Sequence, residues 1–148
     1  MAIADRRAEV TWEGPLSEGA GALGLVSSGA ASLPVTWASR VERPDGRTSP
    51  EELLAAAHAS CYSMALAAAL GRAGAPPERL DVSAVVSLGP RPGGGVEVTA
   101  STLEVRGVVP GLDEAGFQEL ADTAEKGCPI SNAIRGNVTI TLSAVLAS

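Results

Sequence analysis

Two cysteines, Cys61 and Cys128, are the residues of this chain best suited to covalent chemistry, and they lie far apart in the sequence. Cys61 lies inside the apolar, helix-like segment 50–64, and Cys128 stands between Gly127 and Pro129, where one helix is expected to end and another to begin. Such a pair suits a nucleophilic thiol with a resolving partner rather than a local metal-binding knuckle. Two cysteines and one histidine are also too few for a complete zinc site of sulfur and nitrogen ligands.

Cys61 needs a nearby cation to act as a nucleophile, because burial in the middle of an apolar helix raises the pKa of a thiol and makes it inert. Arg40 and His58 are the best candidates, and His58 precedes Cys61 by one helical turn. The alternative is a small buried cysteine beside a histidine that faces another element. Cys128 is expected at a helix N-terminus, where free backbone amides favour a thiolate, but a packed capping cysteine fits the same position.

Glu51 and Arg40 could complete the same site. Glu51 lies ten residues before Cys61, which on an ideal helix is about 15 Å along the axis and about 80° around it. These side chains cannot touch on one straight helix, so either an arginine reaches between them or a second copy of the helix supplies one of them. A guanidinium can bind a thiolate on one edge and a carboxylate on another. The alternatives are a first-turn carboxylate favourable to the helix dipole and a rim arginine whose stem covers apolar surface.

The elements expected around these residues form separate runs of strands and helices. Strands are predicted at residues 8–13, 22–27, 33–42, 80–88, 96–109 and 137–146, and helices at 49–71 or 49–74, 113–126 and 129–135. Alternation in the third strand places Arg40 on the face opposite Trp37. The order βββ, α, ββ, αα, β argues for a single α+β domain over residues 1–148.

The long helix and the hairpin carry more detailed signals. Ser49 as N-cap, Pro50 at the first helical position and Glu52 closing a capping box mark the helix start. The helix is apolar nearly all round, so it should be central and covered on more than one side. In the strand at 96–109, the apolar positions change phase, which indicates a bulge or bend.

Composition excludes several classes of function. Apolar residues make up 45% of the chain and aromatic residues only 3%, so small aliphatic side chains do the packing. The net charge of −6 without a basic run argues against nucleic acid and anionic membranes as partners. Residues 53–70 could suggest a membrane span, but polar interruptions favour a buried core helix. No signal peptide is expected, which predicts a cytoplasmic location where cysteines are more often reactive than permanently cross-linked.

Two segments carry a family resemblance. Residues 49–66, SPEELLAAAHASCYSMAL, closely resemble the signature of the osmotically inducible protein C (OsmC) and organic hydroperoxide resistance (Ohr) family, and residues 128–134, CPISNAI, resemble its second motif. The resemblance covers essentially the whole chain. His58 before the first cysteine, and an arginine on the strand before the long helix, are more similar to the OsmC branch. The resemblance implies an OsmC-like α+β fold and an intertwined homodimer with its sites at the subunit interface.

The same resemblance implies a thiol peroxidase that reduces organic hydroperoxides, and hydrogen peroxide more weakly, in the response to oxidative or osmotic stress. Cys61 would be the peroxidatic cysteine, Cys128 the resolving cysteine, Arg40 the activating arginine and Glu51 its orienting carboxylate. The disulfide between Cys61 and Cys128 would be reduced by an external dithiol. A lipoyl-bearing protein is the family-based expectation, and thioredoxin or small thiols are the alternatives. No metal, haem or flavin is implied.

Several assignments stay open at this point. Arg43 and Arg47 lie close enough in sequence to compete with Arg40 for the activating role, and His58 either tunes the thiol or packs in the core. The alternative function is a non-catalytic protein of the same fold that binds an apolar ligand or senses redox state. A general disulfide reductase is disfavoured because the chain has no Cys-x-x-Cys motif.

Overall fold

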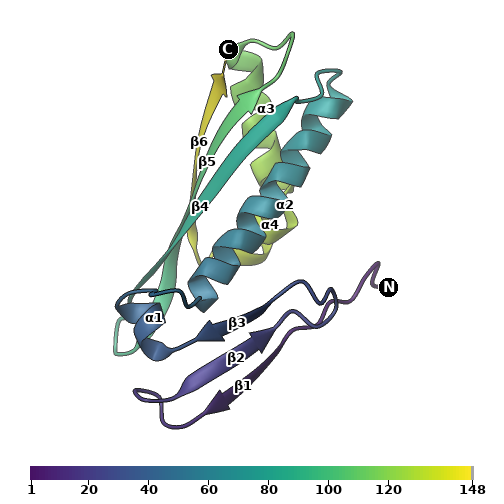
Figure 1. Cartoon of the computed structure of the whole chain (residues 1–148). Helices are drawn as coiled ribbons and strands as arrows, with labels where there is room; N and C mark the ends of the chain where they lie inside the picture. The colour runs from purple at the N-terminus through teal and green to yellow at the C-terminus, as the bar shows by residue number, and fades with distance from the viewer. Residues whose placement is uncertain (148) are drawn as a thin grey trace. The chain divides into compact units, whose positions relative to one another are not determined.

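The computed structural model describes residues 1–147 and has an α+β architecture with two sheets (Figure 1). The chain divides into two compact units, Met1–Leu53 and Leu54–Ser148. The single domain expected over residues 1–148 stays a prediction, and each unit is described by itself. In chain order the elements are β1 (Glu9–Glu13), β2 (Ala20–Gly24), β3 (Ser32–Val35), α1 (Trp37–Val41), α2 (Pro50–Arg72), β4 (Arg79–Pro90), β5 (Val96–Val108), α3 (Glu114–Gly127), α4 (Pro129–Ile134) and β6 (Thr139–Ala147).

The first unit contains an antiparallel sheet in the order β1-β2-β3, followed by the short helix α1. The strand predicted over residues 33–42 is therefore wrong beyond Val35. Thr36 starts a helix instead: its hydroxyl accepts from the Ser39 backbone N–H at 3.0 Å, and the Ser39 hydroxyl accepts from the Thr36 N–H at 3.0 Å. This reciprocal capping box satisfies two backbone donors, which favours helix over the alternation of side chains that suggested a strand.

Helix α2 begins and ends at the residues that the sequence indicates. The Ser49 hydroxyl accepts from the Glu52 N–H at 3.1 Å, as an N-cap does. The Glu52 carboxylate accepts from the Thr48 hydroxyl at 2.7 Å, whereas the prediction had it close a capping box. At the other end, Gly74 has a φ of 77° and the Ala75 N–H donates to the Leu70 carbonyl at 2.9 Å, which is a Schellman-type ending.

The sheet of the second unit has the order β4-β5-β6, with β4 and β5 antiparallel and β5 and β6 parallel. The register shifts after Ser87, because Ser87 pairs with Ala100 while Leu88 pairs with Val98, which leaves Thr99 as the additional residue. The bulge predicted from the sequence is thus confirmed. Helix α3 begins at its expected cap, where Asp113 accepts from the Gly116 N–H at 2.8 Å.

One face of this sheet forms the core of the second unit together with α2 and α3, and Figure 1 shows both helices on the same side of the strands. Buried core residues come from α2, the sheet and α3: Tyr62, Leu66, Leu70, Leu103, Val105, Ala144, Phe117, Ala121 and Ala124. Helix α2 has the length and composition of a membrane span, with a mean hydropathy of 1.5 and 28% of its most apolar window buried. That is weak evidence for a membrane, because core helices of soluble proteins meet the same criteria.

Gly107 on β5 is a point of close packing in this core. A Cβ at Gly107 would lie 2.7 Å from Cζ of the fully buried Phe117 and 3.2 Å from Cδ2 of Leu80. We expect Gly107→Ala to lower the free energy of unfolding by about 1–3 kcal/mol, because the buried ring has little room to move. Urea denaturation measures this change. Gly71→Ala is the matched control: it has nothing within 4 Å, and it should be neutral or stabilising by up to about 1 kcal/mol. Equal effects at both positions would contradict the packing argument.

Candidate functional site

The structure brings Cys61 and Cys128 together within the second unit. Cys61 lies near the middle of α2, and Cys128 forms the junction at which α3 ends and α4 begins. Pro129 occupies the first position of α4, where its missing N–H costs nothing, so α4 can begin directly after Cys128. Cys61 packs against the core cluster that contains Cys128, the two lie close enough for Cys128 to raise the pKa of the Cys61 thiol, and both thiols are free.

The two thiols differ in environment. Cys128 is fully buried, and its Sγ accepts from the Ser131 backbone N–H at 3.5 Å, while Cys61 is partly exposed. Burial raises the pKa of the Cys61 thiol above its ordinary value. A hydrogen bond from the Ile130 backbone N–H lowers this pKa, and the neighbouring Cys128 raises it further. Within its own unit, Cys61 is therefore held toward the protonated form.

An apolar groove gives access to Cys61 along the faces of α2 and α3. Its volume is about 360 Å³. Its lining consists of Cys61, Met64, Ala65, Ala68, Ala69, Arg72, Thr123, Ala124, Gly127 and Pro129. Small side chains thus surround the sulfur, and the one charged lining residue, Arg72, lies three helical turns further along α2. A groove of this kind accommodates an apolar substituent next to the thiol.

Arg40 and Glu51 form a bidentate ion pair within the first unit. Arg40 Nε donates to Glu51 Oε1 and Oε2 at 3.1 and 3.2 Å, and Nη2 donates to Oε1 at 2.8 Å. Nη1 takes part in none of these three bonds. Arg43 and Arg47 are exposed, and Arg47 donates to the Asp45 carbonyl at 3.5 Å. Of the three arginines considered from the sequence, Arg40 is the one that pairs with Glu51.

The surroundings of Arg40 correct the sequence-based prediction. Arg40 lies on α1 rather than on a strand, and its guanidinium carbon lies 5.9 Å from the centre of the Trp37 ring. The prediction that these side chains point to opposite faces is therefore wrong. Residues three apart alternate on a strand but share a face on a helix, so the change of element reverses the geometry.

His58 is fully buried and directs both ring nitrogens at serine hydroxyls. Nδ1 lies 2.7 Å from Ser101 Oγ on β5, and Nε2 lies 2.7 Å from Ser131 Oγ on α4. Burial lowers the pKa of His58 below its ordinary value; Arg135 also lowers it and Glu125 opposes the shift. Sequence analysis missed Ser101 and Ser131, because a serine in a strand and another in a short helix carry no local pattern that identifies a shared partner.

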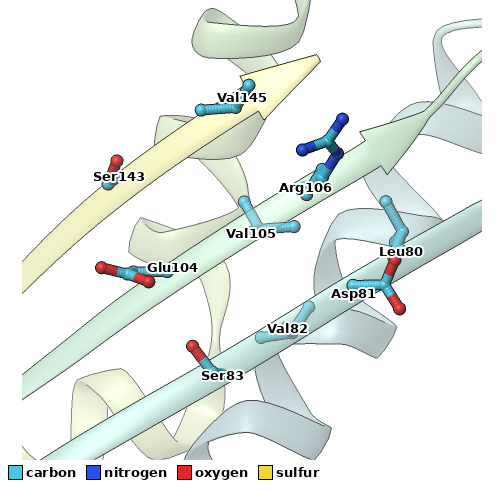
Figure 2. Close-up of a pocket in the computed structure, with 9 residues that line it drawn as sticks. All are labelled: Leu80, Asp81, Val82, Ser83, Glu104, Val105, Arg106, Ser143 and Val145. Atoms are coloured by element: carbon cyan, nitrogen blue, oxygen red, sulfur yellow. The ribbon is translucent and has the colours of Figure 1, made fainter. Parts of the chain in front are cut away.

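A larger hollow of about 640 Å³ lies on the outer face of the β4-β5-β6 sheet. Figure 2 shows its polar lining, including Asp81, Glu104 and Arg106, on exposed positions of two strands. Neither cysteine lines it, so it is separate from the thiol pair. Between residues 1 and 147, no group of three or more His, Cys, Asp or Glu side chains is arranged to hold a metal ion.

Comparison with known proteins identifies the family. Residues 43–143 match the family model described as OsmC-like protein. The chain belongs to the OsmC family. It is 36% identical to the peroxiredoxin OsmC of Escherichia coli (strain K12), over 91% of this chain and 93% of that protein. It is 41% identical to an organic hydroperoxide resistance protein of Xanthomonas axonopodis pv. citri, over 65% of this chain and 66% of that protein.

Solved structures of OsmC-family proteins share the fold. The organic hydroperoxide resistance protein OhrB of Bacillus subtilis superposes with a TM-score of 0.74 and 28% identity, covering 93% of this chain and 97% of that chain. An OsmC protein from Legionella pneumophila gives a TM-score of 0.75 and 26% identity, covering 98% and 99%. The OsmC-like α+β fold expected from the sequence is thus confirmed.

The buried His58 of this OsmC-family chain predicts an acid-dependent loss of stability. Since its folded pKa is lower than the ordinary value of 6.5, the unfolded chain binds the additional proton, and stability falls as the pH drops below 6.5. The slope from this one group is at most about 1.4 kcal/mol per pH unit. Urea denaturation between pH 7.5 and pH 5, compared with His58→Gln, isolates the contribution from that of the carboxylates. Identical pH profiles for the two proteins would contradict a neutral buried histidine.

Proposed function

We propose that this chain is a cysteine-based thiol peroxidase that reduces organic hydroperoxides to alcohols. The observation that carries the proposal is the contact between a partly exposed thiol in an apolar groove, Cys61, and a fully buried thiol, Cys128, from a distant part of the sequence. A hydroperoxide-related role is also supported by relatives named peroxiredoxin OsmC and organic hydroperoxide resistance protein.

The proposed chemistry uses sulfur alone. The Cys61 thiolate attacks one peroxide oxygen, the O–O bond breaks, and the leaving alkoxide takes a proton to become the alcohol, leaving Cys61 as a sulfenic acid. The Cys128 thiol then attacks the Cys61 sulfur, and water leaves as the disulfide forms. An external dithiol restores both thiols by disulfide exchange, and we propose a lipoyl-bearing protein for this role.

We propose that Arg40, oriented by Glu51, supplies the cation that Cys61 needs. Burial raises the pKa of Cys61, so a nearby positive charge must favour the thiolate for reaction at neutral pH. The bidentate contact with Glu51 fixes one edge of the guanidinium and leaves Nη1 for a further partner. In this proposal the arginine reaches Cys61 either in the same chain or across a homodimer interface.

The homodimer is part of the same proposal. Helix α2 was expected to be covered on more than one side, yet one stripe of mostly small residues on it is exposed: Ala57, Ser60, Met64 and Ala68. A second copy of the helix is the proposed cover, because small side chains permit close approach of two helices. A cytoplasmic location remains a proposal from the sequence alone.

The raised pKa of Cys61 also favours the second candidate, a non-catalytic protein of the same fold that binds an apolar ligand or senses redox state. Such a protein would keep Cys61 protonated and use the groove only for binding. The two functions differ in whether Cys61 turns over hydroperoxide.

Substitution of each cysteine separates the two candidates. We expect Cys61→Ser to abolish turnover of cumene hydroperoxide, because serine cannot form the sulfenic acid. Cys128→Ser should perform one reduction and then stall with Cys61 as the sulfenic or sulfinic acid. Peptide mass mapping after one equivalent of hydroperoxide should show a Cys61–Cys128 disulfide within one wild-type chain. Turnover that survives Cys61→Ser would sink the peroxidase proposal, and a rate with cumene hydroperoxide no higher than with hydrogen peroxide would contradict the preference for organic substrates.

The role of Arg40 predicts a shift in the pH profile. Without the guanidinium, the Cys61 pKa should exceed that of an ordinary thiol near 8.5, so at pH 7 the thiolate fraction is at most about 3%, and Arg40→Gln should react about 30-fold slower or worse. The deficit should shrink as the pH approaches 9. Stopped-flow rates with hydroperoxide and alkylation by iodoacetamide, each against pH, measure this effect. Arg43→Gln and Arg47→Gln are the matched controls and should leave both profiles unchanged.

A further inference from the structure

The buried contact of His58 with Ser131 links the helix that carries Cys61 to the helix that begins at Cys128. Ser131 Oγ lies 2.7 Å from His58 Nε2, while the backbone N–H of the same serine donates to Cys128 Sγ at 3.5 Å. His58 and Ser131 are both fully buried. One residue therefore contacts the resolving thiol with its backbone and α2 with its side chain.

A second contact ties the same turn to the same helix. The backbone N–H of Ile130, adjacent to Ser131, lies close enough to Cys61, one turn beyond His58 on α2, to lower the pKa of its thiol. The first turn of α4 thus approaches α2 at two neighbouring points, and the hydrogen bond between His58 and Ser131 joins them at one of these.

The other side of the imidazole is fixed as well. His58 Nδ1 is bonded to Ser101 Oγ at 2.7 Å, and Ser101 is fully buried on the central strand of its sheet. In the neutral imidazole one ring nitrogen donates and the other accepts, so the two serine contacts use its full hydrogen-bonding capacity. The ring is consequently held between a rigid strand and α4.

We propose that His58 and Ser131 are positioning residues for the resolving step, in which they hold Cys128 against the sulfur of Cys61. The inference rests on the proposed peroxidase function and assigns His58 no direct role on Cys61. The step they favour forms the S–S bond between Cys128 and the sulfenic acid of Cys61 and releases water. When Cys128 is displaced, the sulfenic acid lasts longer, and a second hydroperoxide oxidises it to the sulfinic acid.

Ser131→Ala and Ser101→Ala form a matched pair that tests this inference. Each removes one hydroxyl from a fully buried position and one 2.7 Å contact with His58. If the network were only structural, each variant would lower the free energy of unfolding by a similar amount, about 1–3 kcal/mol. Neither variant would then change the rate of disulfide formation relative to the rate of sulfenic acid formation. If the network positions Cys128, Ser131→Ala should slow disulfide formation relative to sulfenic acid formation more than Ser101→Ala does, because Ser131 is the serine that also contacts Cys128.

The two steps are resolved by stopped-flow mixing with cumene hydroperoxide, followed by quenching and mass analysis of Cys61. We expect Ser131→Ala to reduce the rate of the second step relative to the first by roughly tenfold or more, since small displacements of reacting groups are costly. The sulfinic fraction should rise correspondingly. Ser101→Ala should lower this ratio of rates less than Ser131→Ala does, and Ser131→Thr, which retains the hydroxyl, should restore most of the wild-type ratio.

The outcomes distinguish this inference from the proposed function. Equal ratios of the two rates in wild type, Ser131→Ala and Ser101→Ala would overturn the positioning role while leaving the peroxidase intact. Absence of any sulfenic acid or disulfide in the wild-type chain would overturn the peroxidase and this inference with it. Urea denaturation of each variant establishes that the protein is folded under the conditions of the kinetic measurements.

Discussion

The proximity of the two thiols is the constraint that the packing of helices in the second unit must satisfy. Cys61 is presented by α2 and Cys128 by the junction of α3 and α4, so the two thiols come together only if these helices pack correctly. Tyr62, next to Cys61, ensures part of this packing: its ring is fully buried and its hydroxyl donates to the Ala121 carbonyl on α3 at 3.1 Å. Core packing and site geometry therefore share the same residues.

Burial also determines which side chains near the thiols carry a charge. The polar groups buried near the thiols are neutral, because His58 is kept uncharged between two serines. Within residues 1–147, no buried side-chain nitrogen or oxygen lacks a hydrogen-bond partner. The charged pair of Arg40 and Glu51 belongs to the first unit instead. A neutral network can hold α4 without altering the thiolate equilibrium as strongly as a fixed charge would.

The sequence predicted the helix ends and the bulge, which depend on residues that are close together in the chain. Caps and breakers located α2, α3 and α4, and the change of phase in β5 located the bulge, because each signal arises from neighbouring backbone groups. It failed at α1, where apparent alternation over residues 35–42 concealed the capping box of Thr36 and Ser39. The contacts of His58 with Ser101 and Ser131 arise from tertiary packing, and no spacing in the chain encodes them.

The burial that shapes the groove also creates the need for a cation. Small apolar side chains beside Cys61 favour an organic substituent over water, and the same low polarity raises the pKa of the thiol. A more open site would ionise the sulfur more easily but would lose its contacts with the substituent. In the proposed peroxidase, selectivity for organic substrates and dependence on Arg40 are therefore two consequences of a single physical cause, the partial burial of the sulfur among apolar side chains.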